Sequence, residues 1–213
     1  MPSLVLADDS KGMFDQVRED YQTHGRRLTN RAMWALLHYR FGIWAAYVRF
    51  GPLRWVMGKI YGVVGIVLPI VSGVYIERRM VVGRRFHIIH PGMVLLHPEA
   101  TFGDDCGVMH NVTIGTNMTG GAPTIGNDVF IGCGAVILGD IKIGDGVRIA
   151  ANSLVISDVP SGAMAMGVPA KVYPGRGHGP AAVEAQRAMT ARMNAGAAVS
   201  PPTESLFPHF TAA

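Results

Sequence analysis

Large apolar residues recur every six positions along the middle of this 213-residue chain. This period fits neither an amphipathic α-helix nor an alternating β-strand. A six-residue repeat is typical of a parallel β-helix, in which each unit forms a short strand and a turn and stacks on the coil below. We therefore predict a mainly β solenoid with three units per coil. Its anchors are Ile76, Val82, Ile88, Leu96, Phe102, Val108, Ile114, Ile125, Ile131, Ile137, Ile143, Ile149 and Val155.

A second six-residue series, of small or apolar residues, is expected to point inward too. It includes Cys106, so this thiol is interpreted as core filling rather than redox chemistry. Glycine often follows an anchor, as in Gly83 and Gly103, and we interpret these glycines as residues that allow turns closed to a side chain. The series runs through Ala100, Cys106 and Val112 and resumes at Val129, Ala135, Ile141 and Val147.

Two anchor steps are too long. The step from Ile88 to Leu96 is eight residues and contains His90, and the step from Ile114 to Ile125 is eleven residues and ejects the loop 116–123. Solenoids carry binding features on such insertions. We therefore look for the functional site at these two places.

The region before the repeat has a different composition. Residues 32–75 are rich in aromatic and aliphatic residues and predict two or three packed helices, with a break near Pro69. The chain is thus divided into a helical region (1–75), the solenoid (76–173), and a C-terminal segment (174–213) with one helix over 180–194 and a flexible tail.

Charge is uneven along the chain. Lys and Arg outnumber Asp and Glu by 13 to 6 in residues 1–90, whereas acids prevail afterwards by 9 to 6. The dispersed arginines, without aromatic nucleic-acid motifs, argue against DNA or RNA. The basic, apolar first part suits peripheral contact with an anionic membrane or, alternatively, an oligomer interface.

The predicted compartment is the cytoplasm, with the inner face of the membrane as a contact surface. The two cysteines, Cys106 and Cys133, cannot form a disulfide framework and have no zinc-site spacing, and the first residues do not resemble a signal peptide.

An ordered set of motifs resembles the serine acetyltransferase group of hexapeptide-repeat acyltransferases, over about residues 31–173. The motifs are VTIG (112–115), APTIG (122–126), IGCGA (131–135), LGDI (138–141) and GVPAK (167–171). The segment YRFG (39–42) and the helices after it resemble members found with exopolysaccharide genes.

This resemblance implies a left-handed parallel β-helix that forms a homotrimer, or a hexamer of paired trimers, with active sites between neighbouring prisms. It also implies transfer of an acetyl group from acetyl-CoA to a hydroxyl, without a metal. His90 matches the general base of the family. An imidazole suits that role, because its pKa near 6.5 lets it remove a hydroxyl proton at neutral pH.

Further site residues come from the same resemblance. His110 and His97 are assigned to acceptor binding, although an isolated histidine on a solenoid is often only solvated. Coenzyme A is expected to pass Gly115, Thr116, Cys133 and Ala151, with Lys171 near its phosphates or, alternatively, as a solvated lysine ending the solenoid.

Departures from the family pattern bear on the acceptor. The acidic residue before the base is replaced by Ile89, the residue that orients the base falls on Tyr75, and the Arg-His pair of the loop is replaced by Gly121 and Ala122. Glu77 is the nearest carboxylate that could orient the base. Since free serine would lack a cation for its carboxylate, a sugar or exopolysaccharide precursor is the favoured acceptor. L-serine is the alternative, and a non-catalytic scaffold is the second alternative.

Overall fold

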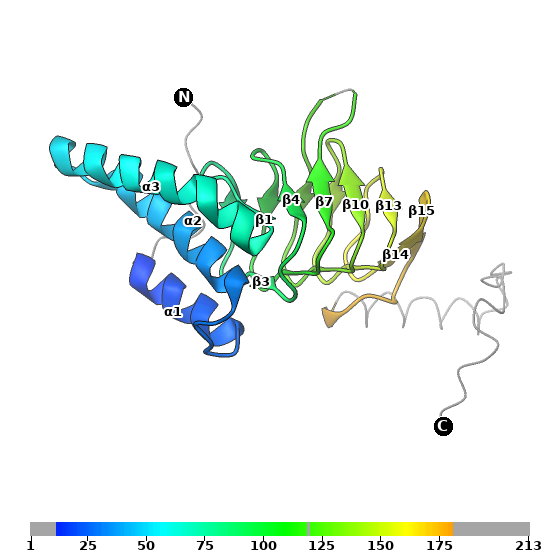
Figure 1. The fold of residues 1–213 in the computed structure, drawn as a ribbon. Helices are drawn as coiled ribbons and strands as arrows, with labels where there is room; N and C mark the ends of the chain where they lie inside the picture. Colours follow the sequence, from blue (N-terminus) through cyan, green and yellow to red (C-terminus); the bar gives the residue numbers. More distant parts are fainter. Residues whose placement is uncertain (1–11, 119, 181–213) are drawn as a thin grey trace, which may run out of the picture.

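The computed structural model describes residues 12–118 and 120–180 (Figure 1). Three helices come first: α1 (Met13–Thr23), α2 (Arg31–Tyr47) and α3 (Gly51–Ser72). Short strands follow as far as Tyr173. They are β1 (Val74–Tyr75), β2 (Val81–Val82), β3 (His87–Ile88), β4 (Val94–Leu96), β5 (Thr101–Phe102), β6 (Gly107–Val108), β7 (Thr113–Gly115), β8 (Thr124–Ile125), β9 (Phe130–Ile131), β10 (Val136–Leu138), β11 (Lys142–Ile143), β12 (Arg148–Ile149), β13 (Leu154–Val155), β14 (Met164–Gly167) and β15 (Ala170–Tyr173).

The strands form a three-sided solenoid, which confirms the predicted parallel β-helix. Sheet A has the order β1-β4-β7-β10-β13, sheet B the order β11-β8-β5-β2, and sheet C the order β15-β14-β12-β9-β6-β3. The chain visits A, B and C in turn, so the prism has an A–B, a B–C and a C–A edge. The strand pairs are parallel except β14 with β15, which closes one end of sheet C as an antiparallel hairpin.

The strand register shows where the two long steps lie. Val136 pairs with Leu154, so a regular coil has 154 − 136 = 18 residues. Val74 pairs with Val94, a spacing of 94 − 74 = 20, because the coil includes the eight-residue step. Phe102 pairs with Ile125, a spacing of 125 − 102 = 23, because the coil includes the loop 116–123. The insertions thus leave the stacking intact and protrude from the edges.

The core follows the predicted pattern. All anchors from Ile76 to Val155 are buried, and so is the second series, including Cys106. The Cys106 thiol donates to the Gly126 carbonyl, and burial raises its pKa to about 12. This thiol is therefore a core residue, as predicted.

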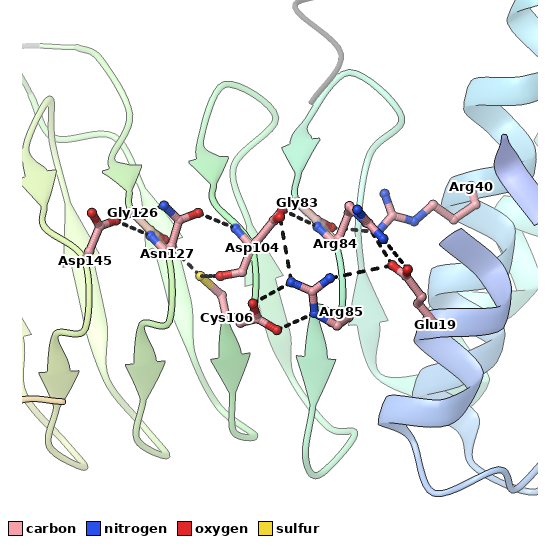
Figure 2. A network of polar contacts seen from close by, with 11 residues as sticks. Glu19, Arg40, Gly83, Arg84, Arg85, Asp104, Cys106, Gly126, Asn127 and Asp145 are labelled. Atoms are coloured by element: carbon pink, nitrogen blue, oxygen red, sulfur yellow. Dashed lines mark hydrogen bonds and ion pairs between the residues drawn. The ribbon is translucent and has the colours of Figure 1, made fainter. Parts of the chain in front are cut away.

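A ladder of side-chain-to-backbone hydrogen bonds runs along the B–C edge (Figure 2). Each amide donates to a side chain one coil on: Arg84 to Asp104, Asp104 to Asn127, and Asn127 to Asp145. The close stacking of these coils explains the glycines that precede the ladder, and it confirms that these positions are closed to a side chain. Gly83 and Gly103 do not have the positive φ of a turn glycine; a Cβ there would lie 2.3 and 2.5 Å from atoms of the next coil.

Helices α1 and α2 cap the open end of the solenoid. The Tyr39 hydroxyl donates to the Met80 carbonyl, and Arg40 donates to the carbonyls of Val82 and Gly83. Arg40 also forms a buried ion pair with Asp20 at 3.0 Å. These bonds satisfy the free edge of β2, which would otherwise expose unpaired backbone groups.

Helix α3 differs from the prediction of packed helices broken near Pro69. It continues through Pro69 to Ser72, because a proline in the last turn removes only one hydrogen bond. It is also mostly exposed: Ser72 is its only buried residue. The predicted helix over 180–194 lies, from residue 181 on, outside the described residues.

Candidate active site

His90 lies on the C–A edge, in the eight-residue step between β3 and β4. Its side chain is exposed. The eight-residue step stacks on the next coil, since the Asn111 amide donates to the Gly92 carbonyl. This places the His90 ring beside that of His110, with the ring centroids 6.0 Å apart. Both belong to the predicted site, and the fold brings them together.

His110 is the better enclosed of the two. Its Nδ1 atom is buried and has no hydrogen-bond partner among the described residues. A buried ring nitrogen without a partner is costly. His110 therefore has hydrogen-bonding capacity that the described residues leave unused.

The same edge carries three of the predicted cofactor residues. Cys133 follows His110 one coil on, because the Gly134 amide donates to the His110 carbonyl. Ala151 lies in the next coil, where the Asn152 amide donates to the Cys133 carbonyl. Lys171 pairs with Met166 in the β14–β15 hairpin at the end of this edge. The residues from His90 to Lys171 therefore form one column.

The remaining predicted residues lie on the A–B edge. Gly115 is the last residue of β7 and Thr116 follows it, and the Gly139 amide donates to the Gly115 carbonyl. His97 occupies the same position one coil earlier and accepts a hydrogen bond from the Glu99 amide. Within one chain, sheet A separates these residues from His90. A site that uses both groups must be assembled from the edges of two copies.

Glu77 also lies on the A–B edge. Its carboxylate pairs with Arg79 at 3.2 Å. Among the described residues, no hydrogen bond joins it to His90. The structure therefore does not bring Glu77 to the base as a carboxylate partner within the chain.

Between β7 and β8 the chain leaves the prism at the A–B edge, where residues 116–118 and 120–123 are described (Figure 1). Gly121 has φ +75° and lies against the solenoid: a Cβ built on it would be 2.5 Å from the Asp140 Cβ. Position 121 thus has no room for a side chain in this backbone.

A pair of histidines, His24 and His87, lies at β3, just before His90 in the chain, and sequence reasoning missed this pair. His24, the residue after α1, accepts from the Ile88 amide through Nε2 and donates from Nδ1 to the Asp20 carbonyl, so its ring is neutral in this arrangement. His87 contacts the His24 ring edge-on at 4.9 Å. Burial lowers the pKa of both imidazoles, and positive charge on His24 or His90 would lower that of His87 further. Residues 8–31 gave no apolar periodicity from which α1 could be predicted.

Metal ligation has no evident place in this histidine-rich region. Across residues 12–118 and 120–180, no three His, Cys, Asp or Glu side chains are grouped so as to hold an ion.

The outer faces of the sheets differ. On sheet A, four of the five side chains in register are apolar and form an apolar stripe: Tyr75, Leu95, Val136 and Leu154, with Thr113 in the middle. The corresponding row on sheet B is Val81, Thr101, Thr124 and Lys142, of which only Val81 is apolar. Tyr75 and Leu95 are 45% and 48% exposed. An apolar strip of this kind marks a contact surface.

Comparisons with known proteins agree with this architecture. The family described as "Bacterial transferase hexapeptide (six repeats)" matches residues 122–157. The serine acetyltransferase of Mycobacterium tuberculosis is 44% identical over 106 residues, which are 48% of this chain and 46% of that protein. The putative colanic acid biosynthesis acetyltransferase WcaB of Escherichia coli K12 is 38% identical over 47% of this chain and 63% of its own length.

A solved structure extends the similarity to the fold. The crystal structure of Neisseria gonorrhoeae serine acetyltransferase in complex with serine superposes with a TM-score of 0.63 at 27% identity, and covers 75% of this chain and 68% of that one. The chain thus covers about half to two thirds of the length of these three proteins.

Proposed function

We propose that this hexapeptide-repeat chain, whose solenoid is similar to that of serine acetyltransferases, transfers an acetyl group from acetyl-CoA to a hydroxyl, most favourably one of a sugar or exopolysaccharide precursor. The observation that carries the proposal is the pair of His90 and His110 on the C–A edge. His90 is open to solvent, and His110 has a buried ring nitrogen that lacks a partner among the described residues.

The two imidazole rings are assigned different roles, His90 in proton transfer and His110 in holding the acceptor. The His90 imidazole takes the proton of the acceptor hydroxyl as its oxygen attacks the thioester carbonyl carbon. The tetrahedral intermediate then collapses, the C–S bond breaks, and the proton passes to the leaving thiolate. The products are free coenzyme A and an O-acetyl ester. His110 holds the acceptor by a hydrogen bond, and backbone N–H groups of the coil edges stabilise the oxyanion.

The cofactor is assigned to the column below the two histidines. Its members Cys133 and Ala151 are small, so a thin pantetheine arm can lie against the backbone. Lys171 ends the column with a positive charge suited to a phosphate. Gly115 and Thr116 join this site from the A–B edge of a neighbouring copy. We therefore propose a homotrimer, in which the apolar stripe on sheet A is covered.

The acceptor is inferred from the loop. A closed site for free serine needs a cation for the carboxylate. At Gly121 the backbone excludes an arginine, and the nearby Asp140 is itself acidic. A sugar hydroxyl is held by hydrogen bonds and needs no such cation. The similarity to WcaB supports this choice.

L-serine is the second candidate acceptor. It is favoured by the 44% identity to the serine acetyltransferase of M. tuberculosis over 106 residues. In this case another cation must take the place of the missing arginine.

An acceptor panel tests the proposal. The purified full chain is mixed with acetyl-CoA and with oligosaccharides, nucleotide sugars or L-serine, and free thiol is followed together with the mass of the product. Thiol release with a saccharide and a saccharide ester as product is the expected result. Release with serine alone establishes the second candidate. No turnover, combined with no coenzyme A binding in calorimetry, establishes a scaffold instead.

A further inference from the structure

The exposed side of α3 is a feature that the proposed reaction does not use. At 3.6 residues per turn, its ten exposed large apolar side chains cover about half of the helix circumference. The opposite half carries glycines, the exposed Arg54 and the partly covered Tyr61, and it packs on α2. The exposed set, called the α3 face below, is Leu53, Trp55, Val56, Ile60, Val63, Val64, Ile66, Val67, Ile70 and Val71.

The length and polarity of α3 match a lipid surface. The helix has 22 residues and is therefore about 33 Å long. It is long and apolar enough to cross a membrane, yet only 6% of its most apolar window is buried. A continuous apolar face of this size marks an interaction site on a protein that is otherwise well packed.

The charge around the face selects the partner. Residues 21–76 contain seven Lys or Arg and no Asp or Glu, and all of the seven except the buried Arg40 are exposed. Arg49, Arg54 and Lys59 are exposed near the start of α3, and Lys59 lies over the Trp55 ring at 5.7 Å from its centroid. Cations and a tryptophan beside an apolar face are the arrangement that binds anionic lipid headgroups while the apolar side chains enter the acyl boundary.

The packing of α3 indicates that it lies along the membrane rather than across it. α3 packs on α2 and is tied to it, since Arg31 of α2 donates to the Val71 carbonyl. α2 in turn holds Arg40, whose guanidinium is bonded to Asp20 and to the end of the solenoid. A spanning α3 would draw this charged assembly into the hydrocarbon, which is costly.

We propose that the α3 face binds the surface of an anionic phospholipid bilayer, with the helix parallel to the membrane plane. The solenoid is thereby held close to the bilayer. This interaction is separate from acetyl transfer and does not depend on it.

Vesicle flotation tests the proposal with the purified full chain. Vesicles of phosphatidylcholine alone are compared with vesicles of equal parts phosphatidylcholine and phosphatidylglycerol. We expect the protein to float with the anionic vesicles only, and to be released by high salt, which screens the charges. The proposal is overturned if the protein does not float, or if it floats equally with both kinds of vesicle. It is also overturned if flotation resists both high salt and alkaline carbonate, which is the behaviour of a membrane-spanning helix.

Matched variants locate the contact. The double variant Ile66→Glu/Ile70→Glu is expected to lower the vesicle-bound fraction by about tenfold or more. Phe14→Glu, on the exposed Phe14 of α1, adds the same kind of charge elsewhere in the helical region and is expected to leave binding unchanged. Equal binding by both variants contradicts the proposal. Another result would also contradict it: the wild type binds no vesicles, and the double variant forms a smaller oligomer than the wild type. The α3 face would then be an interface between two copies of this chain.

Discussion

The ring centroids of His90 and His110 lie 6.0 Å apart, although 20 residues separate the two histidines in the chain. The spacing matches the coil that contains the eight-residue step, so each histidine stands one coil from the other on the same edge. A hydroxyl placed between the rings can give its proton to one and be held by the other.

His110 is expected to act on the acceptor more than on the chemical step. His110→Ala removes a ring that holds the hydroxyl, so KM for the acceptor should rise by about tenfold or more, while kcat falls less. Steady-state kinetics at saturating acetyl-CoA measures both constants. A loss of kcat with an unchanged KM would assign His110 to the reaction itself.

Two edges of the prism are expected to meet in one site. His90→Asn changes the C–A edge, and Gly115→Trp changes the A–B edge, so each variant alone should be inactive. In mixed trimers of the two, a site with both edges intact forms in about one quarter of cases. Co-expression should therefore restore up to about a quarter of wild-type activity. No recovery in verified mixed oligomers would show that each chain contains its own complete site.

Position 121 is expected to reject the arginine of serine-specific relatives. Gly121→Arg should lower the free energy of unfolding by about 1–3 kcal/mol more than Gly120→Arg, because overpacking against the Asp140 backbone and side chain adds to the cost of a positive φ. Gly120 has φ +85° and no neighbour within 4 Å of a Cβ, which makes it the matched control. Equal losses in urea denaturation would show that the loop moves away freely.

The buried ion pair of the cap is expected to matter for stability. Arg40→Met leaves the Asp20 carboxylate buried without its cation, and should cost about 3–5 kcal/mol. Burial already raises the pKa of Asp20 despite Arg40. Arg79→Met removes an exposed partner of Glu77 and should cost less than about 1 kcal/mol. Urea denaturation of the two variants compares them, and similar losses would contradict the capping role of α2.

The cap is also expected to weaken in acid. Burial lowers the pKa of His24, so the folded state favours the neutral ring. The contribution of the neutral ring to the free energy of unfolding is therefore lost as the pH falls below the unfolded pKa of about 6.5. A proton on Nε2 would face the Ile88 amide. His24→Gln should have a lower Tm at neutral pH but a flatter dependence of Tm on pH. His97→Gln is the control and should keep the wild-type slope; an equal slope in all three proteins would refute the role of His24.

The repeat made much of the fold predictable. Anchors such as Ile131 and Ile149 are buried because each stacks on the coil below, and the two long steps account for the register spacings of 20 and 23 residues. The column from His90 to Ala151 follows from the same register. Local patterns therefore sufficed wherever the structure is periodic.

Contacts outside the period could not be predicted. The hydrogen bond from the Ile88 amide to His24 joins residues that are 64 positions apart in the chain. No pattern in the polar segment 8–31 predicts it. The absence of room at Gly121 depends on Asp140, a neighbour only in three dimensions. The apolar composition of α3 indicated burial, but nothing in the described chain covers its outer half.

The most direct test of the central claim is the turnover number of His90→Asn. Free thiol release from acetyl-CoA is followed with an acceptor that the wild type uses, and coenzyme A binding is measured by calorimetry. If His90 is the base, kcat falls by about 10²–10⁴-fold while coenzyme A affinity stays within about twofold. An unchanged kcat in a correctly folded His90→Asn protein would contradict the account.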